Sequence, residues 1–117
     1  MKDKLLELIE NACDEASRPG WDGDGGEPVS EATYSLAKLF AQSLPDDLPA
    51  PQRVIVSHNG GIGIEWCPHT PQRAVYVSIC GDGIDWAVIE FGKPCSGQID
   101  LPDCRELVEA IRRINEE

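Results

Sequence analysis

Positive charge is scarce in this chain. Its 117 residues include 10 lysines and arginines against 21 aspartates and glutamates, which gives a formal net charge of −11. A surface of this sign repels the phosphate backbone of nucleic acids, so the sequence argues against direct nucleic-acid binding. Two interpretations of the charge remain open. Acidic residues favour solubility, and they can also steer a protein toward a partner that presents a basic surface.

Long apolar runs are also missing, so the sequence predicts no segment that crosses a membrane. The N-terminal stretch is not typical of a secretory signal, because Glu7 and Glu10 interrupt its apolar residues. The five cysteines have no Cys-x-x-Cys pair and no regular spacing, which predicts buried thiols and no disulfide framework. These absences favour a cytoplasmic protein, and the length favours one domain over residues 1–117.

Apolar residues recur at helical spacing in three segments of the chain. The predicted helices are residues 3–17, 31–44 and 103–115. Ser30 is a typical N-cap for the second helix. Asp103 and Glu106 have the spacing of a capping box at the start of the third helix, with Asp in place of Ser or Thr.

The middle of the chain alternates between apolar and polar residues, which indicates the strands of a half-buried sheet. The predicted strands are residues 53–57, 62–66, 73–80 and 84–91. In the third strand, Ala74, Tyr76 and Ser78 share one face, and the valines and the isoleucine between them share the other. Short connections favour an antiparallel meander, and residues 92–97 are expected to form a loop. The order ααββββα therefore predicts an α+β fold, with a four-stranded sheet and helices packed on one face.

A glycine-rich segment, residues 20–30, separates the first two predicted helices. Four glycines in this stretch predict an ordered turn or a ligand-binding loop, and Trp21 is expected to anchor it on the core. Asp22, Asp24 and Glu27 could ligate a hard cation, although the glutamate that closes a calcium-binding loop is missing. The other interpretation is that these carboxylates accept hydrogen bonds from backbone N–H groups of the loop.

Cys67, His58 and His69 are the other candidates for chemistry. A thiol and imidazoles could bind zinc or form a cysteine–histidine pair, but their spacing matches no zinc motif and Pro68 interrupts the strand. The sequence contains no phosphate-binding, dinucleotide-binding or Gly-x-Ser-x-Gly motif. We therefore predict no catalytic residue, no metal and no cofactor. Trp66 and Trp86 are expected to lie in the core.

Part of the chain resembles a family of small bacterial proteins that carry a GWDGYGA-type loop and a GGIxLEW-type hairpin. The motifs that carry the resemblance are Gly20-Trp21-Asp22-Gly23, Pro28-Val29-Ser30, Pro49-x-Pro51 and Gly60-Gly61-Ile62-Gly63-Ile64-Glu65-Trp66. It covers residues 20–66 and departs from the family pattern at Asp24 and Gly26. The resemblance implies the order helix, loop, helix and hairpin, and it implies no reaction.

The function that these observations favour is binding to another protein without catalysis. Small acidic chains without catalytic motifs are typical of inhibitors, immunity proteins and phage anti-defence proteins. The partner is expected to present a basic surface. The alternative is a protein that binds a metal or a small ligand through residues 20–30. The predicted contact residues are Trp21, Asp22, Asp24, Glu27, Asp46 and Asp47.

Overall fold

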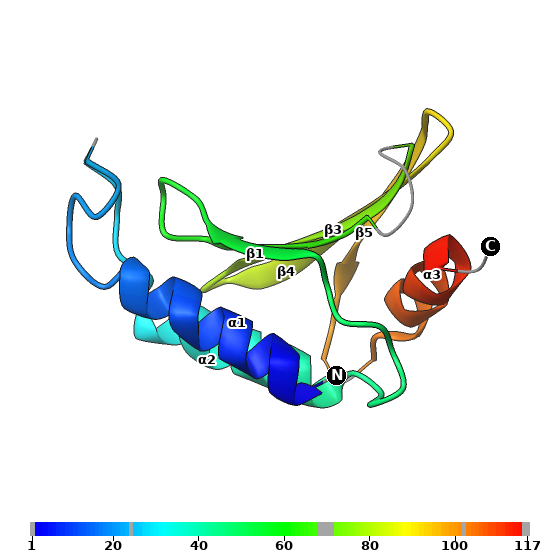
Figure 1. The fold of residues 1–117 in the computed structure, drawn as a ribbon, viewed down its shortest axis with the longest axis horizontal. Helices are drawn as coiled ribbons and strands as arrows, with labels where there is room; N and C mark the ends of the chain where they lie inside the picture. The colour runs from blue at the N-terminus through cyan, green and yellow to red at the C-terminus, as the bar shows by residue number, and fades with distance from the viewer. Residues whose placement is uncertain (1, 24, 68–71, 102, 116–117) are drawn as a thin grey trace.

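A computed structural model describes residues 2–23, 25–67, 72–101 and 103–115 of the chain (Figure 1). The structure contains both α-helices and β-strands, which confirms the predicted α+β class. The helices are α1 (Lys2–Glu15), α2 (Glu31–Ser43) and α3 (Arg105–Asn115). The strands are β1 (Arg53–Val56), β2 (Ile62–Trp66), β3 (Arg73–Cys80), β4 (Gly83–Glu90) and β5 (Lys93–Ile99).

The strands form one antiparallel sheet in the order β1-β2-β3-β4-β5, so each strand pairs with its neighbour in the sequence. The meander is confirmed, but the predicted number of four strands is wrong. Residues 93–99 were expected to begin as a loop and instead form β5 at the edge of the sheet. Its residues 93–96 are all exposed, so the strand lacks the apolar alternation that marks the other strands.

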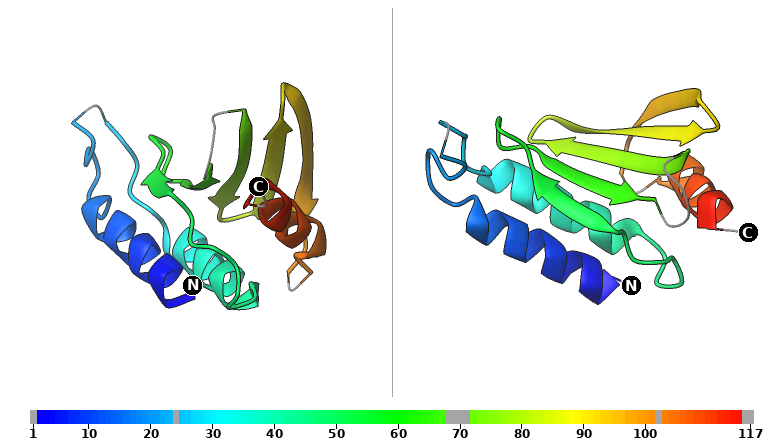
Figure 2. Two further views of the ribbon diagram at one scale, coloured as in Figure 1. Left: turned by 45° about the vertical axis from the view of Figure 1, so that its right-hand side comes forward. Right: turned by 45° about the horizontal axis from the view of Figure 1, so that its top comes forward.

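All three helices lie on the same side of the sheet (Figures 1 and 2). Helix α1 runs beside α2 and contacts β1, α2 contacts β3, and α3 contacts β3 and β4. Alternate strand residues point toward these helices and are buried, whereas the residues between them face away from the helices. We call these two sides the covered face and the open face. The expected packing of helices on one face agrees with this arrangement.

The core lies between the covered face and the helices. Its largest fully buried side chain is Trp66, which donates a hydrogen bond from Nε1 to the carbonyl oxygen of Pro49, 3.0 Å away. Phe40 of α2 and Leu5 of α1 are also fully buried in this core. Trp86 is 7% exposed and belongs to the same core, so the prediction that Trp66 and Trp86 are core residues is confirmed.

Ser30 begins α2 as predicted, because its hydroxyl accepts a hydrogen bond from the Thr33 amide. The predicted capping box of α3 is wrong. The helix begins at Arg105, and the Asp103 side chain accepts from the Arg105 amide and pairs with the Arg105 guanidinium. That guanidinium and the amide hold the pKa of Asp103 below its usual value. The ion pair draws the carboxylate to Arg105 and away from the capping-box pattern.

The five cysteines all carry free thiols. Cys104 is buried, and burial together with nearby Asp103 raises the pKa of its thiol. Cys13, Cys67 and Cys80 are half-buried, so the expectation of buried thiols holds fully only for Cys104. Cys95 is exposed and contradicts it outright. It lies on β5, where the edge position leaves the side chains of residues 93–96 in solvent.

Candidate functional site: the open face and its surroundings

The open face of the sheet carries a shallow hollow with a volume of about 390 Å³. Ile55 and Tyr76 stand beside it and are 39% and 37% exposed. No described helix covers this side of the sheet (Figures 1 and 2). The hollow therefore presents apolar surface to solvent on a paired part of the sheet.

The pairing of the strands explains why the surface is hollowed. Gly63 lies opposite Ser78, and Ser78 lies opposite Asp85. In the next row, Tyr76 lies opposite Ala87, which lies opposite the small Ser96. Small side chains in the middle of the face leave space between the larger ones. The residues that line the hollow are Ile55, Gly63, Ile64, Glu65, Tyr76, Val77, Ser78, Asp85, Trp86, Ala87 and Ser96.

Charged side chains border the hollow. Glu65 forms an ion pair with Arg53, with 3.3 Å between Arg53 Nε and Glu65 Oε2, so the two charges compensate each other. Asp85 is exposed and has no ion-pair or hydrogen-bond partner among the residues that the structure describes. The rim of the apolar hollow consequently carries one uncompensated negative charge.

Further negative charge lines a groove of about 350 Å³ between α1 and α2. Its carboxylates, Glu10, Asp14 and Glu31, form no ion pair within the described part of the chain. Burial, assisted by Asp14, raises the pKa of the neighbouring Cys13 thiol to about 11. Burial and then Glu10 raise the pKa of Tyr34 as well. These shifts reflect a surface that disfavours additional negative charge.

The glycine-rich loop is held by its own hydrogen bonds. Trp21 donates from Nε1 to the Glu27 carbonyl oxygen at 2.7 Å, and the Gly26 amide donates to Asp22 Oδ1 at 2.8 Å. A Cβ on Gly26 would lie 2.6 Å from the Asp22 carboxylate, so any larger residue would displace this carboxylate from its hydrogen bonds. Trp21 is half-buried and lies outside the core, so the expectation that it anchors the loop on the core is wrong. It closes the loop on itself.

A second contact fastens the loop to the β1–β2 hairpin. His58 Nδ1 lies 2.7 Å from Asp22 Oδ2, and the Glu27 amide donates to the His58 carbonyl oxygen at 2.8 Å. The Asp22 carboxylate thus accepts from both the loop and the hairpin. A histidine–carboxylate pair can activate a hydroxyl group. The adjacent Ser57 hydroxyl, however, is directed to Asn59 Oδ1 at 2.5 Å.

The candidate metal ligands are not gathered at one place. Among residues 2–23, 25–67, 72–101 and 103–115, no group of three histidine, cysteine or acidic side chains is arranged to hold a metal ion. Asp24 and His69 lie outside the described residues. Cys67 is half-buried, and its backbone amide donates to Gln52 Oε1.

The predicted contact residues occupy two separate places. Trp21, Asp22 and Glu27 lie in the loop at one end of the α1–α2 pair, and Asp46 and Asp47 follow α2 at its other end (Figure 1). A helix of 13 residues separates the two groups by about 20 Å. Both aspartates are exposed, and Asp47 pairs with Arg112 at 3.0 Å. None of these five described residues lines the hollow on the open face.

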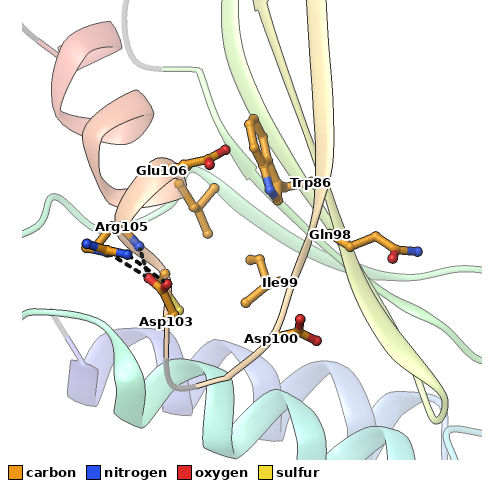
Figure 3. Close-up of a pocket in the computed structure, with 9 residues that line it drawn as sticks. Trp86, Gln98, Ile99, Asp100, Asp103, Arg105 and Glu106 are labelled. Carbon is orange, nitrogen blue, oxygen red and sulfur yellow. Dashed lines mark hydrogen bonds and ion pairs between the residues drawn. The ribbon is translucent and has the colours of Figure 1, made fainter.

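A smaller cavity lies on the covered face where β5 leads into α3 (Figure 3). Its volume is about 140 Å³. The buried side chains of Trp86, Ile99, Cys104 and Leu107 line its interior, and exposed polar residues form its rim. Local sequence patterns do not indicate this cavity, because it depends on β5, whose first residues the sequence predicts as a loop.

Comparison of the chain with protein-family models, with curated proteins and with solved structures yields no match. No described helix is both long enough and apolar enough to cross a membrane.

Proposed function

We propose that the chain is a non-enzymatic, acidic protein-binding module, of the kind represented by inhibitors, immunity proteins and phage anti-defence proteins. The open face of the sheet is its contact surface, and its partner presents a basic surface. The observation that carries the proposal is the uncovered apolar hollow beside Ile55 and Tyr76, with Asp85 unpaired at its rim.

The apolar part of the open face supports a contact with a protein. Exposed apolar surface that is rigid and concave is typical of interaction sites, and tyrosine is enriched among the residues that dominate binding energy. Strand pairing already orders the backbone at Ile55 and Tyr76, so no backbone entropy is lost when a partner covers them. A volume of about 390 Å³ accommodates an apolar side chain of that partner.

The charge of the chain supports a basic partner. A net charge of −11, with unpaired carboxylates on both the open face and the α1–α2 groove, attracts positive surface from a distance. This attraction raises the rate of association more than it raises the final affinity. Salt screens it over about 8 Å at physiological ionic strength. The association rate should therefore fall as the salt concentration rises.

The test uses the full chain as bait in extract of the native host, followed by identification of the captured protein and binding measurements with that purified protein. Tyr76→Asp places a charge beside the hollow and should weaken binding about tenfold or more. The matched control is Leu39→Asp, because Leu39 is a 54% exposed apolar residue on α2, away from the open face. The control should bind as the wild type does.

Two results would overturn the proposal. One is a purified partner that binds the Tyr76→Asp and Leu39→Asp variants equally well. The other is a partner whose contact surface is acidic or purely apolar and whose association rate does not change with salt. Either result would leave the net charge as a feature of solubility.

A further inference from the structure

Strand β5 forms one edge of the sheet and pairs with β4 on one side only. Its register runs from Lys93 to Ile99 without a bulge. The other edge strand, β1, has four residues, whereas β5 has seven. A foreign strand can be added to such an edge, and lysines, prolines, bulges and shortness are the features that prevent it. After Lys93 and Pro94, β5 has none of these features.

The hydrogen bonding of β4 fixes the direction of the backbone groups of β5. The Phe91 amide donates to the Gln72 carbonyl oxygen at 2.8 Å, so the backbone groups of Phe91 point to the β3 side. Successive residues of a strand direct these groups to opposite sides. Those of Glu90 therefore point toward β5 and bond to Lys93, its partner in the register.

From Lys93 onward the direction alternates along β5. The odd-numbered residues bond to β4, and the even-numbered residues direct their backbone groups outward. The outward groups are the C=O of Pro94 and both the N–H and the C=O of Ser96 and Gln98. None of them bonds to another residue in the described part of the chain. An extended segment laid along this edge supplies N–H and C=O groups at the same spacing, so it can pair with them.

The side chains of the same residues lie on the open face. Ser96 lines the hollow and lies opposite Ala87, and Figure 3 shows Gln98 directed away from Trp86. A strand added beyond β5 would run about 4.8 Å from it, with one residue opposite Ser96. A bulky apolar side chain at that position covers the small Ser96 and reaches the side of the hollow that Ala87 lines.

The next row of the open face favours a positive charge. Gln98 lies opposite Asp85, which is exposed and forms no ion pair within the described part of the chain. A residue of the added strand opposite Gln98 would lie two strand spacings, or about 10 Å, from Asp85. The long side chain of a lysine or arginine spans this distance, and a short side chain does not.

We infer that an extended segment of the basic partner binds along β5 as an additional antiparallel strand, with a bulky apolar residue opposite Ser96 and a lysine or arginine opposite Gln98. The inference rests on the proposed function, because it takes the partner to be a basic protein on the open face. Every strand pair of this sheet is antiparallel, and antiparallel pairing is slightly the more stable kind. The partner segment therefore reads, from its N-terminus, cation, any residue, bulky apolar residue.

A second copy of this chain fits the edge less well. If two β5 strands paired around Ser96, each Pro94 would lie opposite Gln98 of the other copy. Proline has no N–H, so both Gln98 carbonyl oxygens would remain without a donor. Each copy also carries a net charge of −11, which opposes their association.

The test uses the full chain and the synthetic peptide acetyl-Thr-Lys-Thr-Phe-Thr-Val-Thr-amide, which has this order of residues. Hydrogen exchange of the β5 amides is followed by ¹H–¹⁵N nuclear magnetic resonance. In the free chain, Ser96 and Gln98 should exchange faster than Cys95 and Gly97, whose amides bond to β4. At a peptide concentration about ten times the dissociation constant, exchange at Ser96 and Gln98 should slow about tenfold, because only the free chain exchanges.

Changes in the peptide test the backbone pairing without altering the protein. Methylation of the phenylalanine nitrogen removes the N–H that bonds to the Ser96 carbonyl oxygen, and should weaken binding about fivefold or more. Methylation of the threonine before it, whose N–H points away from β5, should have little effect. The peptide acetyl-Thr-Val-Thr-Phe-Thr-Lys-Thr-amide has the same composition in reversed order and should bind several times more weakly.

Two variants of the chain with the same change of charge test the position of the lysine. Asp85→Asn should weaken the peptide about threefold, as expected for an exposed ion pair. Glu7→Gln is the control, because Glu7 is exposed on α1, away from the open face. The control should bind the peptide as the wild type does.

Four results would overturn the inference. Rapid exchange at Ser96 and Gln98 with the peptide present would show that no strand is added at β5. Equal binding of the two methylated peptides would exclude backbone pairing, and equal binding of the reversed peptide would exclude the antiparallel register. Sedimentation of the free chain as a dimer with these amides protected would make a second copy the occupant.

These failures are distinct from failure of the proposed function. If Tyr76→Asp weakens binding of the captured protein while the peptide leaves Ser96 and Gln98 unprotected, the open face remains the contact surface and the β5 edge is removed from it. If the peptide protects both amides while the captured protein binds Tyr76→Asp and Leu39→Asp equally well, the edge binds a strand and the proposed role of the open face is wrong.

Discussion

The covered and open faces of the sheet consist of alternate residues of the same strands, yet they have different environments. Trp66 of β2 is fully buried beneath the helices, whereas Tyr76 of β3 is 37% exposed on the other side. Burial of a large side chain stabilises the folded state, and an exposed one adds little until a partner covers it. The same strands therefore bury the side chains of one face and expose those of the other through side-chain direction alone.

Two glycines of the sheet show the same difference between the covered and open faces. A Cβ on Gly97 would lie 3.0 Å from the ring of Trp86 on the covered face. A Cβ on Gly63 would lie 3.2 Å from Ile55 on the open face. The indole is buried in the core and has little room to move, whereas Ile55 is 39% exposed and can change rotamer. Similar close contacts thus have different consequences on the two faces.

The largest effect is expected from Trp66→Ala on the covered face. Removal of the buried ring leaves a cavity, and we expect the free energy of unfolding to fall by about 3–5 kcal/mol. Urea denaturation followed by circular dichroism measures this change. The control is Tyr76→Ala on the open face. If Trp66→Ala lowers the free energy of unfolding no more than Tyr76→Ala does, the division between the covered and open faces is contradicted.

Gly97→Ala is expected to have the second largest effect. The added methyl group meets the fixed indole of Trp86, and overpacking of this kind costs about 1–3 kcal/mol. Gly63→Ala is the matched comparison on the open face, and we expect it to change the free energy of unfolding by less than about 0.5 kcal/mol, because Ile55 can turn away. Equal losses in thermal unfolding for both variants would show that the open face is as rigidly packed as the covered one.

A smaller, pH-dependent effect is expected at the end of the covered face. Glu90 of β4 contacts Arg113 of α3 at 2.7 Å, and this hydrogen-bonded guanidinium lowers the pKa of Glu90. A folded-state pKa below the unfolded one contributes stability above the unfolded pKa, and this contribution is lost as the pH falls through the folded pKa. Below about pH 5, the free energy of unfolding of Glu90→Gln should therefore fall less with decreasing pH than that of the wild type.

Stability curves at several pH values measure that difference. Glu65→Gln on the open face is the control, since its partner Arg53 has a side chain that is 60% exposed and the pair holds no helix to the sheet. If Glu90→Gln and the wild type lose stability in parallel as the pH falls, the ion pair does not link α3 to β4.

A small effect on stability is expected from Tyr76→Ser on the open face. We expect the free energy of unfolding to change by less than about 1 kcal/mol, because the ring is partly exposed and no helix packs against it. The same variant should bind the partner more weakly. Measurement of unfolding and binding on one preparation tests both parts. A variant that unfolds at much lower urea concentration would place Tyr76 with the core residues.

The helices and the first four strands could be predicted from the sequence, because an element that is buried on one side repeats its apolar residues at a regular spacing. The alternation of Val75, Tyr76 and Val77 gave the correct strand and the correct faces. Strand β5 could not be found in this way. An edge strand with exposed side chains has no alternation, and Pro94 and Gly97 are typical of turns as well as of sheet edges.

The sites depend on contacts between distant residues, and local patterns do not encode these contacts. Asp22 meets His58 across 36 positions of the sequence. The hollow requires the register that places Gly63 beside Ser78, and the cavity requires the pairing of Trp86 with Gly97. The acidic residues were visible in the sequence, but which of them are paired internally, as Asp47 is with Arg112, was not.

The sequential order of the five strands has a consequence for the speed of folding. Every strand pairs with the strand next to it in the chain, so each pairing closes only a short loop. Folding rates rise as contacting residues lie closer in sequence, and a meander is among the most local arrangements that a sheet can have. The sheet can therefore assemble hairpin by hairpin, and the long-range step that remains is the docking of α1 and α2 onto its covered face.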